Sequence, residues 1–416
     1  MGRLDQGLIG RLGLGLACLL ALGLGGCRPR AGKPLPPPTV SLNLVAVGDI
    51  LMHQDVQRAA RQDPGGFPAL WADLVPLFQG ADFAFANLES PVAPTTGQPG
   101  MPFQFNAPDT LPAALRASGF TVLATANNHA FDQGAKGVRE TLERLRTQRL
   151  TAVGTGEDRG VAESLQMLER QGLRVAFLGF TDLFNIDLNR RATEPWVRKL
   201  DLEPALQAVR EARAKADLVV VSLHWGNEYQ HQPTGRQRDI ARALVAGGCD
   251  LILGHHPHVL QPVELMEAGG RRALVAFSLG NFISNQDRMY RADQFPVAAG
   301  DNRDGAALKV RFEQRTGADG RLGLELAEAQ VEPLWTENNW GAPASRREIR
   351  VIRVAATEAR VRAELDRLSD PMDGPRALPD EALRRKLILE KQEYLRTLIL
   401  RRKRVADVVG EAFVSR

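Results

Sequence analysis

Short apolar runs that alternate with longer amphipathic stretches are the feature that most limits how this chain can fold. The runs are rich in Val, Leu, Ala and Phe with little polar alternation, which predicts strands buried on both faces. Strand–helix–strand order in turn predicts an α/β sheet. The expected strands are 42–47, 83–86, 121–125, 174–179, 218–223, 251–253 and 273–277. The expected helices are 67–78, 109–118, 137–148, 162–171, 203–214 and 236–246.

The pattern changes after about residue 305. Two apolar runs, 306–312 and 322–331, predict a β-hairpin, and helical spacing then predicts helices over 347–368 and 379–409. The last part of the chain also carries most of its excess of Lys and Arg over Asp and Glu. We therefore expect a basic helical extension over residues 341–416.

The densest basic run of this extension is Arg401-Arg402-Lys403-Arg404. We interpret it as a solvated helix end, where cations interact favourably with the helix dipole. Contact with anionic lipid headgroups or with an anionic polymer is the alternative.

The N-terminus has the pattern of a secretory signal. Arg3 and Arg11 precede an apolar run over 12–24, which is too short to span a bilayer but suits a signal-peptide core. The run ends in Leu24-Gly25-Gly26-Cys27, which resembles a bacterial lipobox, where the Cys is lipidated. The alternative is an ordinary secretory signal in which Cys27 is incidental. We expect an extracytoplasmic, membrane-anchored lipoprotein of the periplasm or cell surface.

These segments predict four regions in the chain. With 25% charged and 44% hydrophobic residues, the composition is that of a globular protein and not of a disordered or multispanning one. We expect a lipoprotein signal peptide at 1–27, a Pro-rich tether at 28–40, one α/β domain at 41–335 and the helical extension at 341–416.

Polar residues gather directly after the expected strands. Ligand sites in open α/β sheets lie outside the carboxyl ends of the strands, so these segments are predicted to converge on one crevice. The segments are Gly48-Asp49, Asn87-Leu88-Glu89, Asn127-Asn128-His129, His224-Trp225-Gly226 and Gly254-His255-His256-Pro257-His258.

Six of the seven histidines fall at or just beyond these strand ends, which predicts a metal site. Imidazole, carboxylate and carbonyl ligands without thiolates suit divalent Zn, Mn or Fe. A pair of metal ions needs a bridging carboxylate and several ligands for each ion, as in phosphatases and nucleases. About that number is available: Asp49, Glu89, Asn128, His224, His256 and His258, with His53 as a seventh.

Together these motifs resemble the CapA/PgsA family of bacterial poly-γ-glutamate capsule biosynthesis proteins. The resemblance covers about residues 41–285 and follows the family's order. It adds Ser90-Pro91, the run Ala130-Phe131-Asp132-Gln133-Gly134, the segment Asn227-Glu228-Tyr229, and Ser278-Leu279-Gly280-Asn281-Phe282 to the segments above. That family is similar to calcineurin-like metallophosphoesterases, which implies an αββα sandwich with a C-terminal helical extension here.

The resemblance also implies individual roles. Asp49 matches the metal-ligating aspartate of the first strand, with His53 four residues on instead of two. Glu89 stands where the wider superfamily has a bridging aspartate, and Asn128 and His224 match further ligands. His256 and His258 match the terminal His-x-His pair. The expected catalytic residues are His129, acting on the leaving group, and Asp132, which orients it. Supporting or substrate-contacting roles are expected for Asn87, Asn127, Glu228, His255 and Asn281.

Three functions remain open on the sequence alone. The first is a lipid-anchored protein of exported anionic polymer biosynthesis, such as a poly-γ-glutamate capsule, with a dinuclear metal site for hydrolysis or transfer. The second is a periplasmic metallophosphoesterase unrelated to capsule. The third is a non-catalytic metal-binding subunit of a membrane synthase. The expected partners are the membrane, an anionic polymer and membrane subunits of a capsule synthase, and we expect no nucleic acid.

Overall fold

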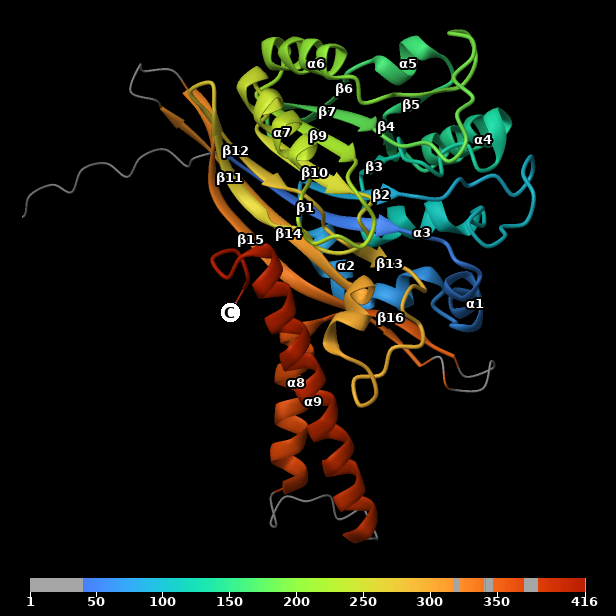
Figure 1. Ribbon diagram of the computed structural model, residues 1–416, viewed down its shortest axis with the longest axis vertical. Helices are drawn as coiled ribbons and strands as arrows, with labels where there is room; N and C mark the ends of the chain where they lie inside the picture. Colours follow the sequence, from blue (N-terminus) through green and yellow to red (C-terminus); the bar gives the residue numbers. More distant parts are fainter. Residues whose placement is uncertain (1–39, 317–321, 340, 342–346, 370–380, 416) are drawn as a thin grey trace, which may run out of the picture. The chain divides into compact units, whose positions relative to one another are not determined.

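The computed structural model describes residues 40–316, 322–339, 341, 347–369 and 381–415. Within them, two large β-sheets pack face to face, and helices cover the outer side of each (Figure 1). This is the αββα sandwich that we predicted. Cys27, the signal peptide and nearly all of the predicted tether lie outside the described residues. None of the helices in the described ranges is both long and apolar enough to cross a bilayer.

The two sheets differ in strand order and are mixed in direction. The first sheet contains, in spatial order, β16 (Ile349–Arg353), β15 (Leu322–Asn338), β14 (Asp304–Thr316), β1 (Ser41–Ile50), β2 (Phe83–Leu88), β3 (Val122–Ala124) and β4 (Thr151–Val153), with β13 (Asn281–Ile283) paired to the end of β1. The second contains β11 (Val263–Ala268), β12 (Arg271–Ala276), β10 (Leu251–His255), β9 (Leu218–His224), β7 (Leu173–Thr181) and β6 (Gln166–Arg170). A two-stranded sheet joins β5 (Thr155–Gly156) to β8 (Trp196–Val197).

Alternate residues of the central strands enter different apolar layers. In β1, Leu44 and Ala46 face the layer between the two sheets, whereas Val45 and Val47 face the helices outside the first sheet. In β9, Val220 likewise lies between the sheets. Because both faces of these strands are buried, neither face can be polar. This explains the continuous apolar runs from which the strands were predicted.

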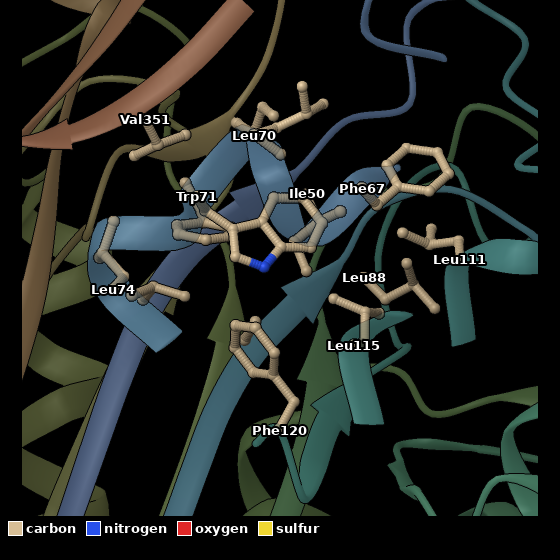
Figure 2. Packing of buried hydrophobic residues seen from close by; sticks show 14 of the residues in the cluster. Ile50, Phe67, Leu70, Trp71, Leu74, Leu88, Leu111, Leu115, Phe120 and Val351 are labelled. Carbon is tan, nitrogen blue, oxygen red and sulfur yellow. The ribbon is translucent and has the colours of Figure 1, made fainter. Parts of the chain in front are cut away.

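The outer layers are helical. Trp71 lies in the apolar layer outside the first sheet (Figure 2). Its indole N–H donates to Ser118 Oγ at 2.8 Å. The helices on this side are α1 (Gln54–Gln62), η1 (Phe67–Leu74), α2 (Val75–Gln79), α3 (Thr110–Ser118) and α4 (Gly134–Thr147). Those on the second sheet are α6 (Leu202–Lys215) and α7 (Gly235–Gly247). The remaining helices are α5 (Arg159–Glu163), η2 (Val297–Arg303), α8 (Val354–Ser369) and α9 (Glu381–Val409).

The helix predicted over 162–171 is wrong. Only the short α5 forms there, and β6 follows it and pairs antiparallel with β7. Gln171 and Gly172, the two residues between these strands, have φ of 53° and 77°. Two successive positive φ values are the signature of the tight turns that join hairpin strands, so this turn fixes the strand pairing.

The helix predicted over 347–368 begins too early. Its first residues form β16, in which Ile349 and Val351 are buried and Arg350 between them is exposed, and the helix starts only at Val354. Val351 packs in the same apolar layer as Leu70 and Trp71 (Figure 2). The segment predicted as a separate extension therefore supplies a strand of the first sheet.

The basic run of α9 is folded against the rest of the chain. Arg401 is 0% exposed and donates to Asp304 Oδ2 at 3.0 Å and to Asp301 Oδ1 at 3.3 Å. Its interpretation as a solvated residue is therefore wrong, because α9 crosses β14 and buries Val405 and Val409 in the core between the sheets. The other three cations of the run are also paired: Arg402 with Glu358, Lys403 with Asp407, and Arg404 with Asp301.

Gly48 allows β1 and the segment before β13 to approach each other closely. A Cβ at this position would lie 1.8 Å from the carbonyl oxygen of Gly280, which accepts the backbone N–H of Asp49 at 3.0 Å. Gly48→Ala is expected to destabilise the fold by about 1–3 kcal/mol or more, the usual effect of overpacking a rigid core. Urea unfolding would measure this change.

Gly235 is the matched control, because a Cβ there would meet nothing within 4 Å. Gly235→Ala is expected to be neutral or slightly stabilising. Equal unfolding midpoints for the two variants would contradict the close approach at Gly48.

Candidate metal centre

The strand ends of both sheets bring the predicted polar residues together. Asp49 pairs in register with Asn87 of β2 and with Asn281 of β13. In the second sheet, His255 of β10 pairs with His224 of β9. Parallel strands carry their carboxyl ends to one edge of a sheet, which places these side chains side by side.

Two groups of three buried side chains have ligand atoms within 4.8 Å of one another. One group is Asp49, Glu89 and His224, and the other is Glu89, His256 and His258. Glu89 is common to both groups, which is the position that a bridging carboxylate would take between two metal ions.

Asn87 holds the two carboxylates in place. Its amide Nδ2 donates to Asp49 Oδ1 at 2.8 Å and to Glu89 Oε2 at 3.2 Å. Asn127 supports it in turn, because its Nδ2 donates to Asn87 Oδ1 at 3.2 Å and to the carbonyl of Leu88 at 2.9 Å. Both asparagines were predicted as supporting residues, and here they form a chain of hydrogen bonds behind the carboxylates.

The histidine-rich turn after β10 closes around Asp49. His258 Nδ1 lies 3.1 Å from both Asp49 Oδ2 and Asn281 Oδ1, while its Nε2 is 3.9 Å from Glu89 Oε1. The backbone N–H of His256 donates to Asp49 Oδ2 at 3.3 Å. The contact with Asn281 fixes the orientation of the His258 ring, and its Nε2 faces Glu89.

This turn has an unusual backbone. His256 and His258 have φ of 94° and 56°, on either side of Pro257. Non-glycine residues seldom adopt positive φ, and such conformations persist only where the surrounding structure imposes them. The hydrogen bonds to Asp49 and Asn281 supply that constraint.

The pKa values of Asp49 and Glu89 are shifted in opposite directions. Burial alone would raise the pKa of Asp49, but the hydrogen bonds and positive charges of His255 and His258 outweigh it and hold this pKa well below its usual range. For Glu89, burial and the negative charges of Asp49 and Glu228 raise the pKa well above its usual range. The charged form is therefore favoured for Asp49 and disfavoured for Glu89.

The buried polar atoms fit a divalent metal. Glu89 Oε1 and His256 Nδ1 are buried without a hydrogen-bond partner among the described residues. Burial lowers the pKa of His224 well below its usual range and that of His256 to about 3, so both imidazoles are neutral, as metal ligands must be. Unpaired buried carboxylates are unfavourable, and a cation beside Glu89 would compensate its charge.

His129 and Asp132 form a separate pair next to these groups. His129 Nδ1 lies 2.8 Å from Asp132 Oδ2, which also accepts the backbone N–H of Phe105 at 2.6 Å. The Phe105 ring packs 4.5 Å from the His129 ring. A hydrogen bond from Nδ1 to Asp132 fixes the ring and leaves Nε2 for proton exchange.

The neighbouring Asn128 connects this pair to the ligand groups. Its Oδ1 lies 2.8 Å from His224 Nε2, so the amide oxygen and the imidazole face the same point. Asn128 thus lies beside one of the ligand groups, and its role as a ligand stays a prediction.

Three further predicted residues, His53, His255 and Glu228, also lie outside both groups. His53 accepts the backbone N–H of Asn285 through Nδ1 at 3.3 Å, and burial lowers its pKa to about 4. His255 Nδ1 approaches Asp49 Oδ1 at 3.2 Å while its ring stacks on Phe85. Glu228 is exposed and contributes its negative charge to the field at Glu89.

Asn185 was not predicted but contacts both residues of the Asn128-His129 pair. Its Oδ1 accepts from Asn128 Nδ2 at 3.2 Å, its Nδ2 lies 3.4 Å from both ring nitrogens of His129, and its backbone N–H donates to the carbonyl of Asn128 at 3.1 Å. Asn185 lies four residues after the end of β7, a strand end at which we predicted no site residue. The strand-end rule, applied to β7 as well, would have found it there.

Comparisons with known proteins identify relatives of this chain. The family model described as "Bacterial capsule synthesis protein PGA_cap" matches residues 43–286. The PGA biosynthesis protein CapA of Bacillus subtilis is 35% identical over 243 residues, which are 58% of this chain and 62% of that protein. The capsule biosynthesis protein CapA of Bacillus anthracis is 33% identical over 253 residues, covering 59% and 60%. The chain thus matches less than two thirds of the length of either relative.

Solved structures give weaker similarity. The calcineurin-like phosphoesterase YfkN of Bacillus subtilis has a TM-score of 0.43 and 14% identity, with 71% of this chain and 91% of that chain covered. A 5'-nucleotidase precursor of Thermus thermophilus has a TM-score of 0.42 and 15% identity, with 86% and 60% covered.

Proposed function

Because the chain belongs to the bacterial capsule synthesis protein family PGA_cap, we propose that it acts in the biosynthesis of an exported anionic polymer, a poly-γ-glutamate capsule. The protein would lie outside the cytoplasm, anchored to a membrane by a lipid on Cys27. The names of the two Bacillus relatives, a PGA and a capsule biosynthesis protein, support the polymer.

The main support for a catalytic role is that two ligand groups share Glu89. His129 lies next to them, because its neighbour Asn128 contacts His224. Two divalent cations, of Mn, Zn or Fe, would be held by Asp49, Glu89, Asn128, His224, His256 and His258. When bound, they would supply Lewis-acid activation for hydrolysis or transfer.

The chain's own residues would position the substrate and move a proton. Asp49 and Glu89 are fixed by Asn87, so the ligand atoms need little reorganisation. His129, held through Nδ1 by Asp132, would donate a proton from Nε2 to the leaving group. This pair favours a catalytic role over a purely structural metal site, because a structural site has no need of an oriented proton donor.

His129→Gln tests the catalytic part. We expect turnover to fall by about 10²–10⁴-fold, the usual contribution of a general acid, with metal content unchanged because His129 is in neither ligand group. Turnover would be assayed on poly-γ-glutamate and on bis(p-nitrophenyl) phosphate. The metal would be quantified by mass spectrometry, with the exposed Lys136→Gln as control.

Deleting the gene from the bacterium that encodes it tests the polymer. We expect exported poly-γ-glutamate to be lost, and to be restored by the wild-type gene but not by His129→Gln. Unchanged polymer in the deletion strain, with phosphodiester turnover intact in vitro, would instead identify a phosphoesterase unrelated to capsule. Full restoration by His129→Gln would exclude the catalytic role.

A further inference from the structure

A pocket separate from the candidate metal centre is lined by residues of α5, β8 and α6. Its volume is about 380 Å³, within the range of small-molecule sites. We call it the Arg198 pocket. The lining residues used below are Arg159, Glu163, Trp196, Arg198, Lys199 and Glu211.

Arg198 is buried in this pocket without an anionic partner. Arg198 is 7% exposed, and its guanidinium carbon lies 4.4 Å from the centroid of the Phe180 ring. Among the described residues, no hydrogen bond or ion pair to this guanidinium is formed. Burial lowers its pKa to about 10. No nitrogen of this guanidinium is among the fully enclosed, unpartnered atoms of the described residues, so the group borders the open space of the pocket, where an anion could bind it.

The backbone around Arg198 is fixed. Its N–H donates to the carbonyl of Gly154 at 2.8 Å, and its carbonyl accepts the N–H of Thr181 at 3.0 Å. These bonds fix the backbone position of Arg198, and the Phe180 ring packs against one face of its guanidinium. The N–H groups of the Arg198 guanidinium are available to another hydrogen-bond acceptor.

Three carboxylates line this pocket: Asp201, and Glu163 and Glu211, both of which already accept a hydrogen bond. Glu163 accepts from Arg159 Nε at 2.7 Å, and Glu211 accepts from Gln207 at 3.0 Å. Neither carboxylate lies within the 4.0 Å of an ion pair with Arg198, although both act on its pKa from a distance. Lys199 pairs with Asp187 at 2.8 Å. Arg159 and Lys199 are thus each paired with a carboxylate, whereas the Arg198 guanidinium donates no hydrogen bond to any described residue.

We propose that the Arg198 pocket binds the oxyanionic group of a small ligand, a carboxylate or a phosphate, through paired hydrogen bonds from the Arg198 guanidinium. Such groups match the planar fork of an arginine and form its strongest hydrogen bonds. Arg159, whose guanidinium carbon lies 5.4 Å from the centroid of the Trp196 ring, and Lys199 also line the pocket, each already paired with a carboxylate. This site does not depend on the proposed function.

Titration calorimetry of the purified full chain would test the site, with inorganic phosphate and acetate as separate probes. The protein would be treated with a chelator so that metal does not contribute binding. We expect at least one probe to bind the wild type and to bind Arg198→Met at least tenfold more weakly. Arg139→Met, on the exposed face of α4, is the matched control and should retain wild-type affinity.

Each outcome decides the proposal or its ligand. Binding of phosphate alone or acetate alone identifies which oxyanion the pocket prefers. Absence of binding by both probes, or equal affinity in the wild type and Arg198→Met, overturns the site. If Arg198→Met does not fold by circular dichroism, Arg198→Lys keeps the charge but not the paired hydrogen bonds. It should still weaken binding several-fold, and wild-type affinity in it would refute the paired contact.

Discussion

Glu89→Gln is expected to remove metal from both ligand groups at once, whereas the loss of one histidine should affect only one. Glu89 is the residue common to the two groups, while His224 belongs to one and His256 to the other. A neutral amide cannot bridge two cations. We expect the affinity for both ions to fall by more than about 100-fold, since even partners outside the ligand set contribute 10–100-fold.

The single-histidine variants separate the two positions. From about two metal ions per chain in the wild type, we expect about one in His224→Ala and in His256→Ala, and close to none in Glu89→Gln. Metal per chain would be measured after dialysis. His53→Gln should retain both ions, because His53 lies outside both groups. Glu267→Gln, an exposed carboxylate on β11, is the control. Wild-type metal content in Glu89→Gln would refute the shared ligand.

Arg401→Met is expected to cause the largest loss of stability among single substitutions in the C-terminal helices. Arg401 is fully buried and bonded to Asp301, Asp304 and the hydroxyl of Tyr290. Removing one partner of a buried ion pair leaves an uncompensated charge, which usually costs about 3–5 kcal/mol. The free energy of unfolding in urea, followed by circular dichroism, would measure it.

This loss should depend on pH. Burial raises the pKa of Asp304 to about 7, although the charge of Arg401 lowers it. A carboxyl whose folded pKa is raised contributes stability below its unfolded pKa, and this stability is lost as the pH rises through the folded value. Without Arg401 the pKa of Asp304 rises further. The difference between variant and wild type should therefore be larger at pH 8 than at pH 5.

The adjacent Arg402 is the matched control. Its side chain is 38% exposed and pairs with Glu358 at 2.9 Å. Surface pairs contribute about 0–1 kcal/mol, so Arg402→Met should change stability by no more than that. The Arg401 network would be refuted by equal losses in the two variants, or by a loss in Arg401→Met that does not change with pH.

Much of the fold could be predicted because the central strands are buried on both faces. Val45 and Leu44 point to different layers, yet both are apolar, so the strand appears as one run. β6 could not be predicted in this way. It has one exposed face and depends on the turn at Gln171-Gly172, where a glutamine adopts a positive φ. The pattern does not reveal β16, because its three apolar residues directly precede a helix and fit the spacing of a first helical turn.

The candidate site was predicted as a set of strand ends, and the structure brings that set together. Which histidine faces which carboxylate could not be predicted, because that depends on the turn after β10 and on Asn281 from a distant strand. His53 and His256 were both predicted as ligands. The structure separates them, since a backbone N–H of Asn285 occupies His53 Nδ1, while His256 Nδ1 has no partner among the described residues.

The pairing of β14 with β1 has a practical consequence for how this protein can be produced. The family match ends at residue 286, but β1 is paired along Ser41–Ala46 by β14, which begins at Asp304. A fragment cut at the end of the match would present a bare, apolar strand edge, a template for association between copies. The region that matches the family model is thus shorter than the segment needed to cover this edge of β1.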